Sequence, residues 1–385
     1  MSRNPLVSII INNYNYGRFL RDAINSAIRQ TYSNIEVIVV DDGSNDNSYQ
    51  IITQYFDTVI PIFKKNGGQA SAFNIGFSGS KGEIIVFLDA DDILTETVIE
   101  KAVQLFEEPD VAKVHWSLWR VDSSGNRNGG IVPSHPLAEG NLREAVIFNG
   151  PNHSASPPYS PPTSGNAWRR SVLERIIPIP ETDFRAGADY YLLVLAPLFG
   201  TVRRLEEPHG LYRVHGSNHT LKPVEEYIKE YTNWFEVTSQ RLHSLLSSQG
   251  IKVTAENWPR ESWYHRIAMA IEQIKQVIKA SEAFILVDGD QWMTKEFVAG
   301  RHRISFIEKD GIYWGEPESD LSAIQEIEHQ RAQGASAIFI AWPSFWWLDY
   351  YKGMTQHLRQ NYQCVQENDL LVGFDLKNRL PYARK

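Results

Sequence analysis

The chain has 385 residues, more than one ordinary hydrophobic core accommodates, so we expect two or three domains. Its net charge of −8, from 38 Lys and Arg against 46 Asp and Glu, argues against a broad nucleic-acid-binding surface. The single cysteine, Cys364, excludes an internal disulfide framework and a cysteine zinc cluster, and it suits a reducing compartment.

The ends and apolar runs of the chain bear on its location. The N-terminus lacks the long apolar core of a signal peptide, and no run approaches the roughly 18 apolar residues of a membrane-spanning helix. We therefore expect a cytoplasmic protein, free or peripheral at the inner face of a membrane.

The first hundred residues alternate between solid apolar runs and amphipathic segments. Solid runs are typical of strands covered on both faces, and strict strand–helix alternation predicts a parallel sheet with right-handed crossovers. The expected strands are 6–11, 36–40, 59–63 and 83–88, and the expected helices are 18–32, 45–56, 69–79 and 95–107.

Polar residues follow each of these strands, and ligands of such sheets bind beyond the carboxyl ends of the strands. The run "IVFLDADD" ends in Asp89, Asp91 and Asp92, and "DDGSND" begins with Asp41 and Asp42. Two carboxylates about 4 Å apart repel by about 4 kcal/mol at an effective dielectric of ~20. A bound Mg²⁺ or Mn²⁺ would offset that repulsion. Helix capping would explain either acid group alone, whereas the two groups together favour a cation site.

Beyond residue 110 the pattern loosens. The segment 114–121 predicts a strand followed by a hairpin or loop, 151–166 is a proline-rich loop, and 184–200 predicts a helix that opens at Asp189. Two helical stretches and then a separate strand–helix rhythm follow. The expected domains are 1–222, a helical linker at 223–283, and a small α/β accessory domain at 284–385.

Two stretches, "PLVSIIINNYNYGRFLRDAINSAIRQTYSNIEVIVVDDGSNDNS" and "NGGQASAFNIGFSGSKGEIIVFLDADD", resemble family 2 glycosyltransferases with the GT-A fold. The resemblance is collinear over about 5–107 and patchier to about 220. It implies an α/β fold with a Rossmann-like, mostly parallel sheet, and inverting transfer from a UDP- or dTDP-linked sugar.

The resemblance also implies which residues hold the nucleotide sugar. Asn12 and Tyr14 would hold the base, with the Tyr14 ring stacked on it, and Asp42 would accept the N3–H of a pyrimidine dione. Asp89 would lie near the ribose. The full implied set is Asn12, Tyr14, Asp42, Asn66, Gly68, Gln69, Asn74 and Asp89, with the glycine-containing segment 66–69 close to the ribose and the donor sugar.

Metal and base positions follow from the same resemblance. Asp91 and Asp92 would bind Mn²⁺ or Mg²⁺ at the diphosphate, and His215 would be a further ligand, although a loop histidine is otherwise usually structural or solvated. Asp189 would take the proton of the acceptor hydroxyl, and a helix-capping role for Asp189 is compatible with this. Where family members often carry Arg or Lys, this chain has Phe73, and where they often carry Glu it has Ala188.

The partners implied are a nucleotide sugar and a saccharide or lipid-linked acceptor, in cell-surface polysaccharide or glycoconjugate synthesis. No nucleic-acid partner is expected, and a homodimer is allowed. The alternative is a non-catalytic sugar-nucleotide-binding or scaffold protein, which the departures at Phe73 and Ala188 favour. A nicotinamide-dependent dehydrogenase and a P-loop NTPase are excluded because their glycine-rich motifs are absent, and a nucleotidyltransferase because its triphosphate loop is absent.

Aromatic residues leave several interpretations open. Trp116, Trp119 and Trp168 could stack on sugar rings, but aromatic residues of this size are more often core. The aromatic run 342–351 is a sugar-binding face, a protomer interface or a core, with core or interface favoured. The segment 286–292 repeats the strand-then-acids pattern and is weak evidence for a second metal site.

Overall fold

The computed structural model describes residues 4–152, 160–216, 224–254, 258, 263–289, 291–292, 300–309, 312–313 and 315–380. The chain forms two compact units, the first from 1–221 and 233–259 and the second from 222–232 and 260–385. The segment expected to be a linker is divided between them: helix α8 (Val224–Ser248) contributes to both units, and α10 (Trp263–Val277) belongs to the second. Among the described residues, no helix has the length and apolarity needed to cross a bilayer.

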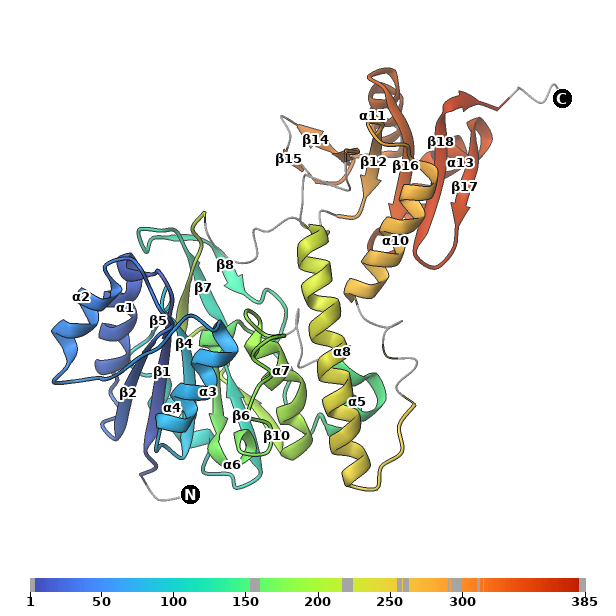
Figure 1. The fold of residues 1–385 in the computed structure, drawn as a ribbon. Helices are drawn as coiled ribbons and strands as arrows, with labels where there is room; N and C mark the ends of the chain where they lie inside the picture. Colours follow the sequence, from blue (N-terminus) through green and yellow to red (C-terminus); the bar gives the residue numbers. More distant parts are fainter. Residues whose placement is uncertain are drawn as a thin grey trace. The chain divides into compact units, whose positions relative to one another are not determined.

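The first unit is built on a seven-stranded sheet of order β10-β6-β9-β4-β1-β2-β3 (Figure 1). The four predicted strands, β1 to β4, are present and mutually parallel, while β9 runs antiparallel to both of its neighbours. The predicted α/β fold class is therefore confirmed. The strand bounds are β1 Val7–Asn13, β2 Ile35–Asp41, β3 Ile60–Phe63, β4 Ile84–Asp89, β6 Val111–His115, β9 Asn166–Arg169 and β10 Thr201–Arg204.

Helices cover both faces of this sheet. Helix α1 buries Phe19, Leu20 and Ala23 because they lie on one face of a 3.6-residue period, and Leu20 and Ala23 join one hydrophobic core with residues of α2 and α4. On the opposite face Phe73 of α3 is fully buried and stacks on Phe87 of β4 at 4.0 Å. The helix bounds are α1 Gly17–Ile28, α2 Ser48–Ile52, α3 Gln69–Gly79, α4 Val98–Leu105, α5 Arg143–Asn149, α6 Arg170–Leu173 and α7 Ala188–Leu195.

The single strand expected at 114–121 is two strands in two sheets. The chain leaves β6 after His115, and β7 (Leu118–Val121) joins a four-stranded sheet of order β5-β11-β7-β8. The other members are β5 Ile93–Leu94, β8 Arg127–Val132 and β11 Gly210–Arg213. Trp116, at the crossing point, and Trp168 are at most 1% exposed, so both are core residues.

The second unit contains the predicted smaller α/β arrangement. Its five-stranded sheet has the order β13-β12-β16-β18-β17. Strands β13, β12 and β16 are parallel, and β18 is antiparallel to both of its neighbours, β16 and β17. The bounds are β12 Ala283–Val287, β13 His302–Ser305, β14 Glu308–Lys309, β15 Ile312–Tyr313, β16 Ala335–Ala341, β17 Tyr362–Glu367, β18 Leu371–Arg379, α11 Asp320–Ala332, α12 Trp346–Tyr350 and α13 Lys352–Asn361.

Two sequence features of the second unit have structural explanations. In the aromatic run, Trp347 is buried in the core while Trp346 and Tyr350 are 44% and 70% exposed. Asp288, after β12, forms a buried ion pair with Arg303 at 3.0 Å and accepts the backbone N–H of Trp292. Asp288 is therefore satisfied by protein donors, whereas Asp290, the other acid of the predicted second metal site, lies outside the described residues.

Candidate functional site

The acids at the end of β4 lie beside the end of β1, as two neighbouring parallel strands require. Asn12 and Asp89 are register partners, and Asn12 Nδ2 donates to Asp89 Oδ1 at 2.8 Å. Gln69 Nε2 also donates to Asp89 Oδ1, at 3.3 Å. The structure therefore brings together three of the predicted residues from three different strand–helix junctions.

Asp92 is engaged by protein groups on both carboxylate oxygens. Ser164 Oγ donates to Oδ2 at 2.7 Å, and the backbone N–H of Arg213 donates to Oδ1 at 3.0 Å. The Arg213 guanidinium in turn donates to the backbone carbonyl of Asp91 at 2.9 Å. With Asp92 only 1% exposed, these contacts hold the acid-bearing turn against β11.

Asp91 and His215, two of the predicted metal ligands, lie in direct contact. His215 Nε2 lies 2.9 Å from Asp91 Oδ2, and the Asp91 side chain is 12% exposed. Two cis ligands of an octahedral ion, each about 2.1 Å from it, are separated by about 3.0 Å. No group of three His, Cys, Asp or Glu side chains suited to a metal occurs in the part of the chain that the structure describes, so oxygens of water and substrate would complete the ion's shell.

Arg18 determines how His215 can act. Arg18 Nη2 contacts His215 Nδ1 at 3.4 Å, and a guanidinium can only donate. Nδ1 then accepts, and Nε2 carries the hydrogen that faces Asp91. For His215 to bind a cation through Nε2, Arg18 must turn away from Nδ1, because Nδ1 would then hold the proton.

Burial and mutual repulsion raise the pKa values of the acid cluster. Burial, followed by the charge of Asp91, raises the pKa of Asp89 to about 7. The same two causes raise the pKa of Asp92 well above its ordinary value. Burial and the charges of Asp91 and Asp89 also raise the pKa of the Tyr16 phenol. In the absence of a cation, hydrogen-bond donors and the raised pKa values of Asp89 and Asp92 offset the repulsion among the acids.

Asp42 organises the loop between β3 and α3. Its carboxylate accepts hydrogen bonds from Lys64 Nζ at 2.5 Å, Asn66 Nδ2 at 3.1 Å, and the backbone N–H groups of Gly67 and Gly68 at 2.9 and 2.7 Å. Four donors fill the acceptor positions of a carboxylate. The predicted contact to a base N3–H stays a prediction, and it requires that one of these donors move away.

The start of α7 places Asp189 near the β4 acids. The backbone N–H of Ala188 donates to Gln69 Oε1 at 3.0 Å, and the charge of Asp189 contributes to the raised pKa of Asp89 after burial and Asp91. Gly187 precedes the helix at φ +71°, and a Cβ there would lie 2.4 Å from the Trp234 ring. A glycine is therefore required to start α7 here.

Two of the predicted residues, Asn74 and Tyr14, make no hydrogen bond to the acids at the end of β4 in the part of the chain that the structure describes. Asn74 exchanges hydrogen bonds with the backbone of Ile179 and contacts Glu181, so it ties α3 to a loop and does not join the acids. Tyr14 is 46% exposed at the end of β1, and its ring is available for stacking. The predicted contacts of Asn74 and Tyr14 with a nucleotide sugar stay predictions.

Sequence reasoning missed Lys113, which is fully buried on β6. Its Nζ has no hydrogen-bond partner among the described residues and lies 5.2 Å from the centre of the Trp168 ring. Burial lowers the pKa of Lys113 well below 10.5, and the charge of Asp189 partly opposes this. A lysine inside the apolar strand "VAKVH" was the available signal.

We expect Lys113→Met to raise the free energy of unfolding by about 1–3 kcal/mol at pH 7, because it removes a buried polar group that lacks a partner. Between the lowered folded pKa and 10.5 the unfolded chain binds the extra proton, so wild-type stability rises with pH and the gain shrinks toward pH 10. Urea denaturation at several pH values measures this, with Lys81→Met as the exposed control. A destabilised variant would instead mean that Lys113 is charged and stabilised by Asp189.

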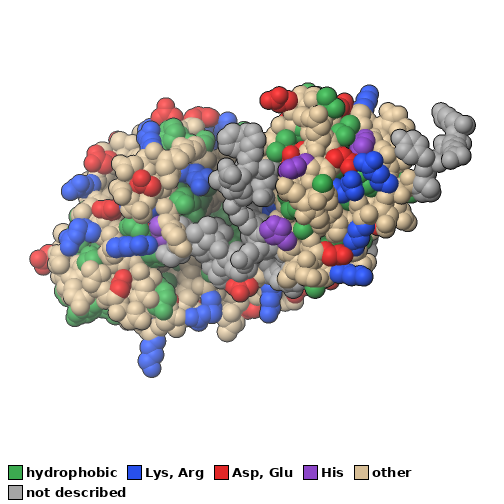
Figure 2. All heavy atoms as spheres, turned by 90° about the horizontal axis from the view of Figure 1, so that it is seen from above, with side chains coloured by type: hydrophobic (Ala, Val, Ile, Leu, Met, Phe, Trp, Pro, Cys, Tyr) green, Lys and Arg blue, Asp and Glu red, His purple; other side chains and the backbone are tan. Residues whose placement is uncertain are grey.

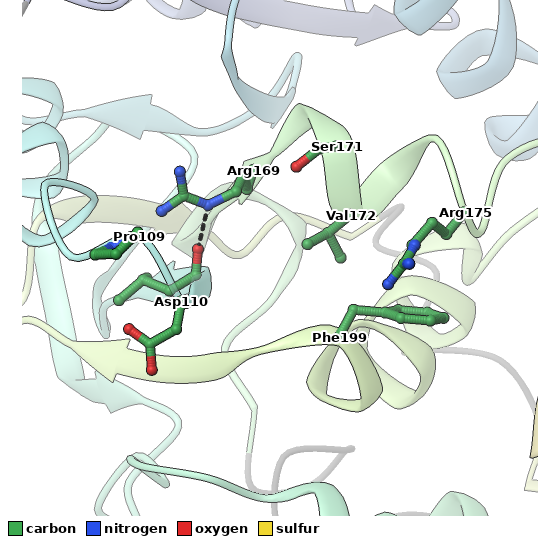
Figure 3. Close-up of a pocket in the computed structure, with 8 residues that line it drawn as sticks. Pro109, Asp110, Arg169, Ser171, Val172, Arg175 and Phe199 are labelled. Carbon is green, nitrogen blue, oxygen red and sulfur yellow. Dashed lines mark hydrogen bonds between the residues drawn. The ribbon is translucent and has the colours of Figure 1, made fainter. Parts of the chain in front are cut away.

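A surface depression of about 310 Å³ lies away from Asp89, Asp91 and Asp92 (Figure 3). It is lined by Arg169, Arg175 and Phe199 among others, at the first residue of β6 and the last of β9. Strands β4 and β6 both run antiparallel to β9, so this is the amino edge of the sheet, opposite the carboxyl edge that holds Asp89. Basic and acidic side chains are interspersed on the face in Figure 2.

Comparisons with known proteins agree with the sequence resemblance. The family described as "Glycosyl transferase family 2" matches residues 8–176. A glycosyltransferase of Nostoc sp. (strain PCC 7120) is 33% identical over 281 residues, which are 70% of this chain and 85% of that protein. Glycosyltransferase GlyG of Streptococcus pneumoniae serotype 4 is 39% identical over 125 residues, 31% of this chain and 42% of GlyG.

The chain is also similar to two solved structures of limited identity. Residues 1–349 of TarS from S. aureus, in complex with UDP-GlcNAc, share 19% identity over 58% of this chain and 64% of that one, with a TM-score of 0.45. A mannosyltransferase of Pyrobaculum calidifontis, in complex with GDP-Man and Mn²⁺, shares 15% identity over 72% of this chain and 77% of that one, with a TM-score of 0.44.

Proposed function

The chain belongs to glycosyltransferase family 2, and on that premise we propose that it catalyses metal-dependent, inverting transfer of a sugar from a UDP- or dTDP-sugar to a hydroxyl acceptor. The acceptor would be a saccharide or a lipid-linked molecule of cell-surface polysaccharide or glycoconjugate synthesis. The observation that supports the reaction is the convergence of Asp89, Asp91, His215 and Asp189 at the carboxyl edge of one sheet.

Side chains at the ends of β1 and β2 would hold the nucleotide. The exposed Tyr14 ring offers a stacking surface for the base. Asn12 Oδ1 is buried and has no hydrogen-bond partner among the described residues, so it offers an acceptor beside Asp89. Asp42 would contact a pyrimidine N3–H after losing one of its present donors.

Asp91 and His215 would hold Mn²⁺ or Mg²⁺, and Asp92 would keep the turn in place through Ser164 and Arg213. When bound, the cation stabilises the negative charge that develops on the departing nucleotide diphosphate. Its positive charge would also offset the repulsion between the carboxylates of the cluster.

Asp189 would act as the general base. Its carboxylate takes the proton of the acceptor hydroxyl while that oxygen forms a bond to the anomeric carbon. The bond from the anomeric carbon to the diphosphate oxygen breaks, and the electron pair leaves with the nucleotide diphosphate. Attack opposite the leaving group inverts the anomeric configuration.

Hydrolysis of the donor tests the proposal without knowledge of the acceptor. The full chain, incubated with a panel of nucleotide sugars and Mn²⁺ or Mg²⁺, is expected to release UDP or dTDP slowly, and EDTA should stop the release. Binding of a nucleotide sugar without any release would instead favour the non-catalytic alternative. Phe73 lends that alternative no support, because it is a core residue. No binding of any donor would contradict both functions.

A further inference from the structure

The side chain of Gln69 joins three elements of the candidate site. Its Nε2 donates to Asp89 Oδ1 and to Thr163 Oγ1, both at 3.3 Å, and its Oε1 accepts the backbone N–H of Ala188 at 3.0 Å. One amide thus connects the end of β4, the turn before β9 and the first residue of α7.

These contacts allow only one orientation of the amide. The N–H of Ala188 can only donate, so the oxygen of Gln69 must face it. The two amide hydrogens then face Asp89 and Thr163, as a carboxylate and a hydroxyl oxygen require. Both donors are occupied by protein atoms, so at most a lone pair of Oε1 remains for a ligand. A direct donor-sugar contact, as the sequence suggested, would use little of this side chain.

The backbone around Gln69 makes the same junction. The N–H of Gln69 donates to the carbonyl of Arg185 at 2.8 Å, and the N–H of Ala70 donates to the carbonyl of Phe184 at 3.1 Å. Gly68 has φ +90°, and a Cβ there would lie 2.6 Å from the Arg185 Cα. The segment that leads into α7 is therefore docked closely on the start of α3.

We infer that Gln69 is a positioning residue that fixes the start of α7, and with it Asp189, relative to Asp89. The inference rests on the proposed function, since it assigns the two carboxylates to opposite ends of the reaction: Asp189 at the acceptor and Asp89 at the nucleotide. A base that is displaced by about 1 Å can lose about 10²-fold in rate, so a fixed spacing has a direct kinetic value.

Two substitutions separate the two halves of this bridge. Gln69→Ala removes all three side-chain contacts. Gln69→Glu keeps an oxygen for the Ala188 N–H but presents a carboxylate to Asp89, so it breaks only the β4 half. Gln54→Glu makes the same chemical change at an exposed site of the same unit and serves as the control.

Hydrogen exchange of the Ala188 amide, which needs no substrate, is the first measurement. Losing one hydrogen bond should speed exchange about fivefold in Gln69→Ala, and Gln69→Glu and Gln54→Glu should exchange like the wild type. Unchanged exchange in Gln69→Ala would overturn the inference whatever the enzyme's activity.

Steady-state kinetics is the second measurement. Both Gln69 variants should lower kcat about 10- to 100-fold with the donor KM unchanged. Both should still melt cooperatively, although below the melting temperature of Gln54→Glu because each loses contacts of Gln69. A raised donor KM with unchanged kcat would overturn the inference in favour of a binding contact. A wild-type chain that binds donor but never turns it over would refute the proposed catalysis, and the exchange result would still decide the structural bridge.

Discussion

Asp189→Asn is expected to lower kcat by about 10²- to 10⁴-fold and to leave the affinity for UDP unchanged, because an amide cannot take the acceptor proton. The substitution is structurally conservative. Asp189 Oδ1 accepts the backbone N–H of Tyr190 at 3.0 Å, and the amide oxygen of asparagine can accept the same bond. Loss of activity should therefore not come from loss of the helix start.

Initial rates of sugar transfer and calorimetric titration with UDP measure the two quantities separately. Asp183→Asn is a matched control, since it makes the same change six positions earlier and outside the acid cluster. If Asp189→Asn loses UDP binding, the residue belongs to the nucleotide site and the base must be sought elsewhere. If transfer persists at the wild-type rate, no proton passes to this carboxylate.

Asp91→Asn is expected to abolish the increase in UDP affinity that Mn²⁺ produces, while metal-independent binding of UDP remains. Removing one charge near a divalent cation costs about 4 kcal/mol or more at an effective dielectric of ~20, which corresponds to roughly 10³-fold or more in affinity. The Asp91 side chain keeps some solvent access, at 12% exposed, and lies beside His215.

Titrations of UDP with and without Mn²⁺ test this directly. Asp57→Asn, at an exposed position of the same unit, should behave like the wild type. A full Mn²⁺ response in Asp91→Asn would place the cation on other ligands. A loss of metal-independent binding as well would indicate that the turn itself had been disturbed.

The sequence predicts the centre of the first unit well because its signals are local. The solid apolar runs correspond to β1 to β4, and the polar residues at their ends converge, as parallel strands demand. The crossing from β6 to β7 was not predicted, because an apolar strand pattern carries no mark of a change of sheet. The antiparallel β9 was missed because a strand of four residues carries no mark of its direction in the sequence.

The roles of individual acids depend on partners far away in the chain. Asp42 is surrounded by donors more than twenty residues away, and Asp92 is held by Arg213, which lies 121 positions later. No motif shows that these oxygens are already engaged. Lys113 shows the converse, since only the structure reveals that its side-chain amine is buried without a hydrogen-bond partner among the described residues.

Helix α8 sets a lower limit on the length of an independently folding catalytic fragment. The family match ends at residue 176, and the last candidate site residue is His215. Trp234 of α8 nevertheless packs against Phe184 and Gly187 and donates its ring N–H to the backbone carbonyl of Asp183. A recombinant fragment that ends at residue 222 would retain all the acids of the candidate site. It would lack Trp234, which packs against the residues at the start of α7. Expression trials guided by sequence profiles alone would thus yield a truncated, poorly folded product, whereas fragments that extend past residue 259 keep the first unit whole.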